Sequence, residues 1–367
     1  MDKETSQINA AGTGLSESAY IRGLDSIRFV CALWVMFFHG NLPPLLAGMD
    51  RSSLTGWVVR TIYAGFFNGP AAVIVFFLIS GFCIHFPQRH GLPLAVGTFY
   101  MRRGVRIGLP WLAASVIGIP FGIGLGAFTA GVGWSLIAES IYYVAYPALL
   151  VARRRFGWRA ILVAAYFCAL LVFMSNRQEP LYMTPSPALT ALLGLPCWLL
   201  GCVLAERFAA PSRLKILDRS GIRLWRFGIW TFSGVILSAR YGGLVSDQWT
   251  LSLFAIPAYF WLRREIAHFQ TNGASRLFEW MGKWSYSIYL AHLVGSAAFS
   301  HFHLADLGYL LNWGIKIVFM LAFCYAFHLV FEWPSHWLAR RIRAARKSAA
   351  LTTPPQPGLL IPHPLKQ

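Results

Sequence analysis

The chain has 367 residues, of which 56% are hydrophobic, 16% are aromatic and only 13% are charged. An ordinary soluble domain carries roughly 25% charged residues, so the composition excludes that class and indicates a chain built for a lipid environment. The formal net charge of +18 raises the alternative of a nucleic-acid-binding protein, which the distribution of the charges can test.

Apolar stretches of about 17 to 25 residues, the length that crosses a bilayer as a helix, recur along the sequence. Helices are expected because lipid cannot satisfy free backbone N–H and C=O groups, and the runs lack the alternation of barrel strands. The sequence therefore predicts an all-α polytopic membrane protein. Its ten transmembrane helices are predicted at residues 26–46, 66–86, 108–128, 133–152, 158–174, 188–206, 226–243, 249–263, 284–302 and 308–331.

The segments outside the predicted spans show a strong asymmetry of basic residues. If the N-terminus is cytoplasmic, 26 of the 32 lysines and arginines fall on the cytoplasmic side, as the positive-inside rule describes. Both termini are thus predicted to be cytoplasmic, with the protein in the plasma (inner) membrane. The net positive charge mostly reflects the orientation of the protein in the membrane. The lipid bilayer is therefore an expected partner, and nucleic acid is not.

The two ends of the chain differ from the rest. Residues 1–20 are polar and contain no apolar run with a cleavage site, so no signal peptide is predicted. Residues 346–367 form a Pro-rich tail that is predicted to be disordered.

Ionisable residues inside the apolar runs are the main candidates for chemistry. The six cysteines lie in or beside the predicted spans without metal-ligand spacing, so we expect reduced packing residues and no metal site. Walker, GxSxG and HExxH motifs do not occur in the sequence, which disfavours ATP hydrolysis, soluble-type serine hydrolase and zinc protease chemistry. A titratable group in a membrane costs at least a few kcal/mol and usually faces a cavity or a partner.

Two such groups lie in the first predicted span, RFVCALWVMFFHG, which carries Arg28 and, eleven residues later, His39. Eleven residues are close to three helical turns, so both side chains face the same way, roughly 16 Å apart along the axis. One cavity could hold both. Arg28 could instead extend to the headgroups, and Asp25, three residues earlier, could pair with it.

Glu139 is the acidic residue that lies well inside a predicted span. Counted from the predicted span ends, Glu139 and His39 both lie roughly 10 Å below the outer surface. A carboxylate beside a histidine fixes its tautomer and stabilises its protonated form, as a general base requires. We therefore expect these side chains to approach within hydrogen-bond distance or within one water of it. A structural hydrogen bond between two helices is an equally good reading, and Lys316 could neutralise Glu139 instead.

Six segments resemble, in the same order along the chain, motifs of the acyltransferase 3 family of integral membrane O-acyltransferases. They are YIRGLDSIRFVCALWVMFFHG, with its Arg, ten residues, His spacing, VIVFFLISGFCIHF, FYMRRGVRIGLPWL, WSLIAESIYYVAYP, WMGKWSYSIYLAHL and FEWPSHWL. The resemblance is colinear over residues 20–343, and it predicts an acyltransferase transmembrane domain over residues 21–345. Each motif alone is weak, but six in order are specific.

The resemblance implies that an acyl group passes to a hydroxyl of a glycan, a lipid-linked sugar or another glycosylated acceptor. The donor would be an acyl-CoA, usually acetyl-CoA, used as a co-substrate with no bound cofactor. His39 is then predicted to be the general base, oriented by Glu139. Arg28 is predicted to help hold the donor or to stabilise the developing oxyanion.

Arg102, Arg103 and Arg106 precede the third predicted span on its cytoplasmic side. Planar guanidinium groups suit phosphate, so these residues are predicted to bind the phosphates of CoA, although the positive-inside rule alone could also account for them. Ser80, beside Gly81, is interpreted as a small surface for close helix packing. His292 could be a second ligand in the cavity, but it is interpreted as a hydrogen-bonded packing histidine.

Two other classes of function fit the same residues. A proton-coupled transporter also buries Arg, His and Glu in a multi-span bundle, but transporters often contain internal repeats with matched broken helices, and the sequence shows no such duplication. The third alternative is a catalytically inactive acyl carrier. The sequence leaves the acceptor, the acyl chain length and the oligomeric state open.

Overall fold

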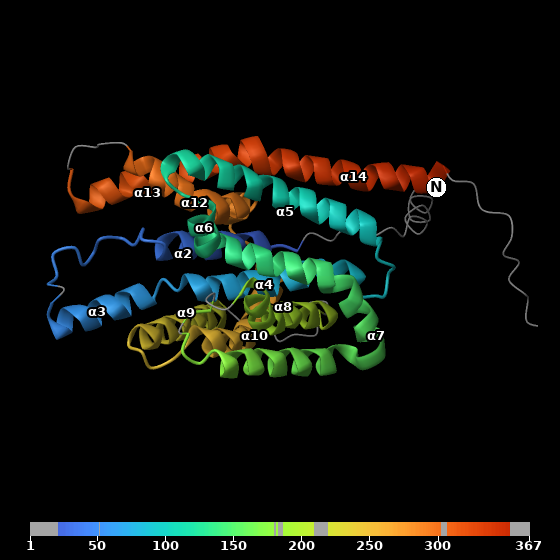
Figure 1. Cartoon of the computed structure of the whole chain (residues 1–367), viewed down its shortest axis with the longest axis horizontal. Coiled ribbons are helices and arrows are strands. Elements are labelled where there is room, and N and C mark those ends of the chain that lie inside the picture. The colour runs from blue at the N-terminus through green and yellow to red at the C-terminus, as the bar shows by residue number, and fades with distance from the viewer. Residues whose placement is uncertain are drawn as a thin grey trace, which may run out of the picture.

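The computed structural model of the chain describes residues 21–50, 52–179, 181–182, 186–208, 219–301 and 307–352. Within these ranges the secondary structure is helical and contains no strand, which confirms the all-α prediction. Helices α5, α13 and α14 lie along one side of the molecule and the second half of α7 along the other, with α2 and α4 between them (Figure 1). The helices are α2 (Leu24–Phe38), α3 (Leu54–Gly65), α4 (Gly69–His85), α5 (Val96–Gly118), α6 (Leu125–Phe128), α7 (Trp134–Ser175), α8 (Pro187–Glu206), α9 (Arg219–Tyr241), α10 (Asp247–Asn272), α11 (Arg276–Gly282), α12 (Ser285–Ser300), α13 (Tyr309–Phe327) and α14 (Trp333–Thr352).

Helix α4 is the central helix, and it is buried on all sides. It packs closely against α8 through two glycines. A Cβ atom on Gly81 would lie 1.9 Å from the carbonyl oxygen of Trp198, and one on Gly201 would lie 2.1 Å from that of Leu78. The prediction that Gly81 permits close packing is therefore confirmed, and the side chains around α4 are held in fixed positions by this contact.

Helix α2 is shorter than the first predicted span. It ends at Phe38, and His39 is its C-cap residue, whose backbone N–H bonds to the carbonyl of Val35. The sequence continues with Gly40 and the turn-forming pair Pro43 and Pro44, which cannot extend a helix. His39 thus lies at the end of a helix rather than seven residues inside one.

Helix α7 covers two predicted spans. It has 42 residues and is broken at Gly157, where φ is 73°, a left-handed conformation that favours glycine. The chain reverses there (Figure 1). At its other end the helical segment begins earlier than predicted, because α6 and a π-helical turn (Thr129–Gly133) lead directly into Trp134. Glu139 is therefore 14 residues from the start of this segment at Leu125, about 21 Å along a helix and not the roughly 10 Å that was predicted.

Five helical segments are long and apolar enough to cross a membrane, at Leu54–Gln88, Val96–Phe121, Leu125–Ser175, Pro187–Glu206 and Tyr309–Ile342. A helix occupies each of the ten predicted segments, but α2 and α12, with 15 and 16 residues, would each extend only about 22 to 24 Å, less than the hydrocarbon core. The count of ten spans and the orientation of the termini stay predictions.

The C-terminal helix α14 continues further than expected. It runs to Thr352, so the first seven residues of the segment predicted to be disordered are helical. Their sequence is rich in Ala, Arg and Lys, which are good helix formers. The polar segment 1–20 and the rest of the tail, 353–367, lie outside the described residues.

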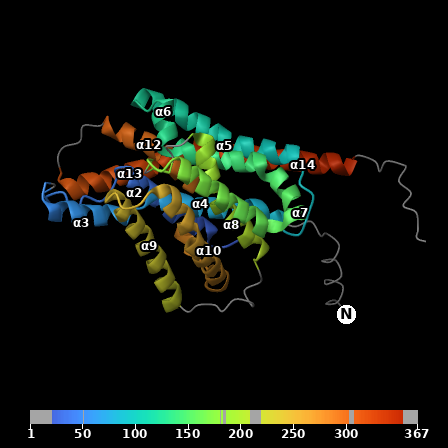
Figure 2. The same ribbon diagram turned by 60° about the horizontal axis from the view of Figure 1, so that its bottom comes forward.

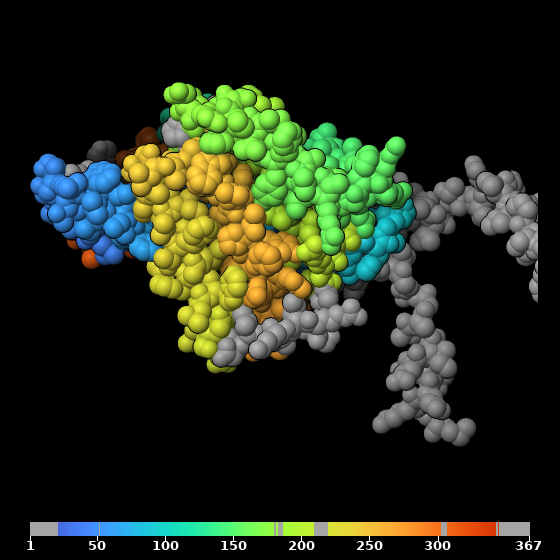
Figure 3. All heavy atoms as spheres, turned by 90° about the horizontal axis from the view of Figure 1, so that it is seen from below, coloured from blue at the N-terminus to red at the C-terminus, as the bar shows by residue number. Residues whose placement is uncertain are grey.

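Helices α9 and α10 project from the bundle at an angle to α4 (Figure 2). Together with the second half of α7 they form a large part of the face shown in Figure 3. Large apolar side chains of these three helical segments are exposed, including Phe167, Phe227, Val235 and Phe260. Such a surface suits contact with lipid chains.

Candidate active site

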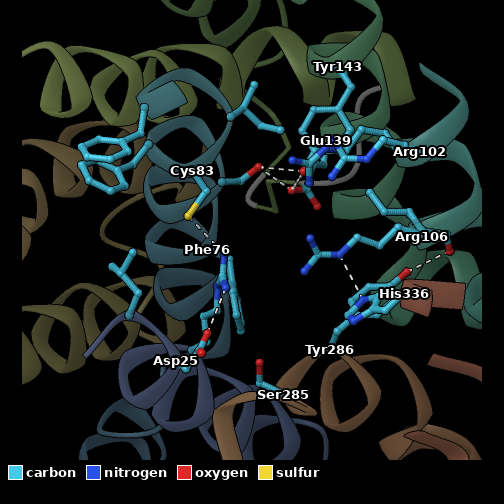
Figure 4. A pocket seen from close by; sticks show the side chains of 18 of the residues that line it. Asp25, Phe76, Cys83, Arg102, Arg106, Glu139, Tyr143, Ser285, Tyr286 and His336 are labelled. Carbon is cyan, nitrogen blue, oxygen red and sulfur yellow. Dashed lines mark hydrogen bonds and ion pairs between the residues drawn. The ribbon is translucent and has the colours of Figure 1, made fainter. Parts of the chain in front are cut away.

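A cavity of about 1200 Å³ opens between α2, α4, α5, α7, α12 and α14. Six basic and three acidic side chains line it, together with two histidines, so it offers a positively charged surface to an anionic ligand. These residues are Arg28, Arg102, Arg103, Arg106, Lys283, Arg340, Asp25, Glu139, Glu332, His328 and His336. Figure 4 shows several of them around the open centre of the cavity.

Five of the six residues predicted for the site line this one cavity: Arg28, Arg102, Arg103, Arg106 and Glu139. They come from three helices, α2, α5 and α7, so their meeting depends on the tertiary fold. The sixth predicted residue, His39, is not among the lining residues.

Arg28 is held at the wall of the cavity by two neighbours. Its Nη1 atom lies 3.1 Å from Oδ1 of Asp25, which confirms the predicted pairing one helical turn apart. Its Nη2 atom lies 3.3 Å from Sγ of Cys83 on α4. The charge of Arg28 is thus directed into the bundle and not toward the lipid headgroups.

The arginines of α5 reach the cavity in different ways. The guanidinium carbon of Arg103 lies 5.4 Å from the ring centre of Tyr143, a cation–π contact. Arg106 donates a hydrogen bond from Nε to Nε2 of His336, over 3.0 Å. Arg102 also lines the cavity, and it is labelled beside Glu139 and Tyr143 in Figure 4.

Glu139 belongs to a hydrogen-bonded group on the wall formed by α4 and α7. Its Oε1 atom accepts a hydrogen bond from Ser80 Oγ, 2.5 Å away, and another from the hydroxyl of Tyr143. Ser80 in turn accepts one from Nε1 of Trp198, over 3.2 Å. Ser80 therefore does more than provide a small packing surface, and no ion pair among the described residues joins Lys316 to Glu139.

His39 contacts a second histidine. Its Nδ1 atom lies 2.9 Å from the carbonyl oxygen of Val35 and 3.1 Å from Nε2 of His292 on α12. His292 is fully buried, and its Nδ1 atom lies 3.0 Å from the carbonyl oxygen of Ile288. Because a carbonyl only accepts, Nδ1 carries the proton in both neutral rings, and Nε2 of His39 is left with a lone pair.

The predicted direct contact between His39 and Glu139 is not found, whereas a contact through one water stays a prediction. Among the hydrogen bonds of the described residues, none joins the two side chains. The depth estimate failed because α2 ends at Phe38, whereas the helical segment that carries Glu139 starts at Leu125. The residue that contacts His39 is His292, for which the sequence favoured a packing role over that of a second cavity ligand.

The histidine pair lies next to the cavity. His292 follows Tyr289 by three residues on α12, so the two share a face of that helix. Tyr289 lines the cavity, and its hydroxyl lies 2.5 Å from Oγ of Ser135 on α7. The pair is thus about one helical turn beyond the cavity wall at Tyr289.

Three more residues that line the cavity were not predicted as site residues from the sequence: Cys83, Glu332 and His336. Glu332 and His336 are four residues apart in FEWPSHWL, a spacing that places two polar side chains on one helical face. That signal was available, but the sequence does not show which other helix faces them. Among the described residues, no three His, Cys, Asp or Glu side chains form a group that could hold a metal ion.

Comparison with known proteins adds an independent line of support. A family model described as an acyltransferase domain, of the acyltransferase 3 type, matches residues 21–329. The acyltransferase MdmB of Streptomyces mycarofaciens is 25% identical over 289 residues, which cover 67% of this chain and 73% of that protein. No solved structure matches the chain.

Proposed function

Since the chain belongs to the acyltransferase 3 family, we propose that it is a membrane O-acyltransferase with acyl-CoA as donor. The acyl group that we propose is acetyl. The acceptor is a hydroxyl of a glycan, a lipid-linked sugar or another glycosylated molecule. The observation that carries this proposal is the convergence of Arg28, Arg102, Arg103 and Arg106 on one cavity next to the histidine pair.

The donor fits the charge of the cavity. CoA carries its phosphates at the nucleotide end, and the thioester is at the far end of a long, thin arm. Arg102, Arg103 and Arg106 bind the phosphates as planar donors, and the arm passes Arg28 toward Tyr289. Arg28 lies roughly 16 Å along the α2 axis from His39, so of its two predicted roles the structure favours holding the donor over contacting the oxyanion.

The chemistry is a direct transfer. Nε2 of His39 takes the proton from the acceptor hydroxyl, the oxygen attacks the thioester carbonyl, and the carbon–sulfur bond breaks to release the CoA thiolate. His292 and the Val35 carbonyl fix the His39 tautomer through Nδ1, which is the role first predicted for Glu139. Glu139, Ser80 and Tyr143 form part of the cavity wall against which the donor binds.

The topology makes this arrangement useful. With both termini cytoplasmic in the plasma (inner) membrane, as the positive-inside rule indicates, the arginines of α5 face the cytosol, where acyl-CoA is found. His39 lies at the opposite end of α2. The acceptor then meets the thioester from the outer side, and CoA does not have to cross the membrane.

The test uses purified protein in lipid nanodiscs, acetyl-CoA labelled in the acetyl group, and a glycolipid extract of the source membrane as acceptor. We expect the label to move to the extract with equal release of CoA thiol. The same protein in sealed vesicles separates the transporter alternative, because a carrier would accumulate solute without consuming the thioester. Intact acetyl-CoA after incubation with a full set of native acceptors would contradict the proposal.

A further inference from the structure

Arg106 is held from the side, and its two terminal nitrogens are left for a ligand. Its hydrogen bond to His336 uses Nε, while the two Nη groups point into the open cavity (Figure 4). The guanidinium fork binds two oxygens of one phosphate through those terminal N–H groups. The contact with His336 therefore fixes the direction of the fork without occupying it.

A buried carboxylate lies beside His336, one turn earlier on the same helical segment. Glu332 is 1% exposed, and its Oε2 atom accepts hydrogen bonds from Ser287 Oγ, 2.6 Å away, and from Nδ1 of His328, 2.9 Å away. Its Oε1 atom lies 3.7 Å from Nε2 of His336. A rigid polar group thus stands behind the histidine that contacts Arg106.

Arg226 provides a comparison, because its partner is a carboxylate where the partner of Arg106 is a histidine. Nε and Nη2 of Arg226 both bond to the buried Glu265, over 3.0 and 2.5 Å, so the charge of Arg226 is neutralised and one of its two terminal nitrogens is occupied. A neutral imidazole accepts one hydrogen bond from Arg106 and brings no negative charge of its own into contact with the guanidinium. That difference suits Arg106 to an anionic ligand and Arg226 to a structural role.

We infer that His336 is a positioning residue, which aims Arg106 at a phosphate of the acyl donor. The inference rests on the proposed function, because it takes acyl-CoA as the ligand of this cavity. It adds α14 to the donor site, so α5 and α14, which are far apart in sequence, both contribute to phosphate binding. The reacting atoms do not touch His336.

The test is a double-mutant cycle on the purified enzyme with acetyl-CoA as donor. His336→Phe removes the acceptor and should raise the donor KM about tenfold with kcat little changed, as expected for loss of a charge-assisted contact. In an Arg106→Ala background the same substitution should change KM less than twofold, because its partner is gone. His336→Gln, whose amide oxygen can accept from Nε, should restore most of the wild-type KM.

Adenosine 3′,5′-bisphosphate, used as a competitive inhibitor, measures binding at the nucleotide site independently of the transfer step. Its inhibition constant should rise with the donor KM in His336→Phe, because it has the nucleotide phosphates and no thioester. Additive effects of His336→Phe and Arg106→Ala, or a fall in kcat with KM unchanged, would overturn the inference. If His336→Phe fails to fold, the His336→Gln and His336→Asn variants test the same contact through their KM values. Absence of any transfer by the wild-type enzyme would instead refute the proposed function.

Discussion

Nδ1 of His39, at the C-terminal end of α2, lies 3.1 Å from Nε2 of the fully buried His292 on α12. The two residues are 253 positions apart in the sequence. Backbone carbonyls accept from Nδ1 of both rings, so the pair has one consistent tautomer, and Nε2 of His39 is the basic nitrogen that remains.

The first prediction concerns His292. His292→Ala removes the contact that helps to fix the His39 ring, so transfer should fall by about 10-fold to 100-fold while the donor KM stays near wild type, as expected for loss of orientation. The rates are measured with purified protein at saturating acetyl-CoA. An unchanged kcat would show that the Val35 carbonyl alone is enough to orient His39.

The second prediction concerns donor binding. Replacing Arg103 and Arg106 with Ala should raise the donor KM strongly and leave the acceptor KM little changed, because phosphate contacts remote from the thioester supply donor binding. The wild-type donor KM should also rise with salt, as screening weakens those contacts. Arg154→Ala with Arg155→Ala is the matched control, since both side chains are exposed and lie outside the cavity. Equal losses for donor and acceptor would indicate that the α5 arginines only set topology.

The third prediction uses Cys83 as a reporter of the cavity. Cys83 is half-buried and lines the cavity beside Arg28, whereas Cys168 is exposed on the far half of α7. N-ethylmaleimide should modify both thiols in detergent-solubilised protein, and acetyl-CoA should protect Cys83 alone. Peptide mass spectrometry gives the extent of labelling at each position. Equal protection of both, or of neither, would place the donor elsewhere.

The fourth prediction concerns the contact between α4 and α8. Gly81→Ala would bring a Cβ atom to 1.9 Å from the Trp198 carbonyl oxygen, so overpacking should destabilise the protein by about 1 to 3 kcal/mol. Gly104→Ala on α5 meets nothing within 4 Å and should be neutral or slightly stabilising, since Ala is the better helix former. Thermal unfolding of both variants in detergent measures the difference, and equal midpoints would contradict the close packing.

The sequence predicts local features of this molecule well. Apolar runs place a helix at each predicted span, and the three-residue spacing places Asp25 against Arg28. Arg102, Arg103 and Arg106 were expected to act together because they lie close in sequence, just before the third predicted span on its cytoplasmic side. Such features depend on helical geometry and composition, which a short stretch of sequence determines.

Contacts between distant helices were harder to predict. The pairing of His39 with Glu139 was inferred from depths counted from the predicted span ends. In the structure the relevant helix ends lie several residues away from the predicted ones, at Phe38 and at Leu125, so the two depths no longer match. Helix ends are the least certain part of a sequence-based assignment. The contacts of His39 with His292 and of Arg106 with His336 join helices whose neighbours only the tertiary fold determines.

The central claim is that His39 is the general base for transfer from acyl-CoA, and the most direct measurement compares the His39→Ala and wild-type transfer rates in the same nanodiscs. We expect a loss of about 10²-fold to 10⁴-fold in kcat, the usual contribution of a general base, with donor binding and thermal unfolding unchanged. His301→Ala, at an exposed histidine whose Nδ1 also contacts a backbone carbonyl four residues earlier, should transfer at the wild-type rate. A His39→Ala enzyme with near-normal kcat would contradict the account.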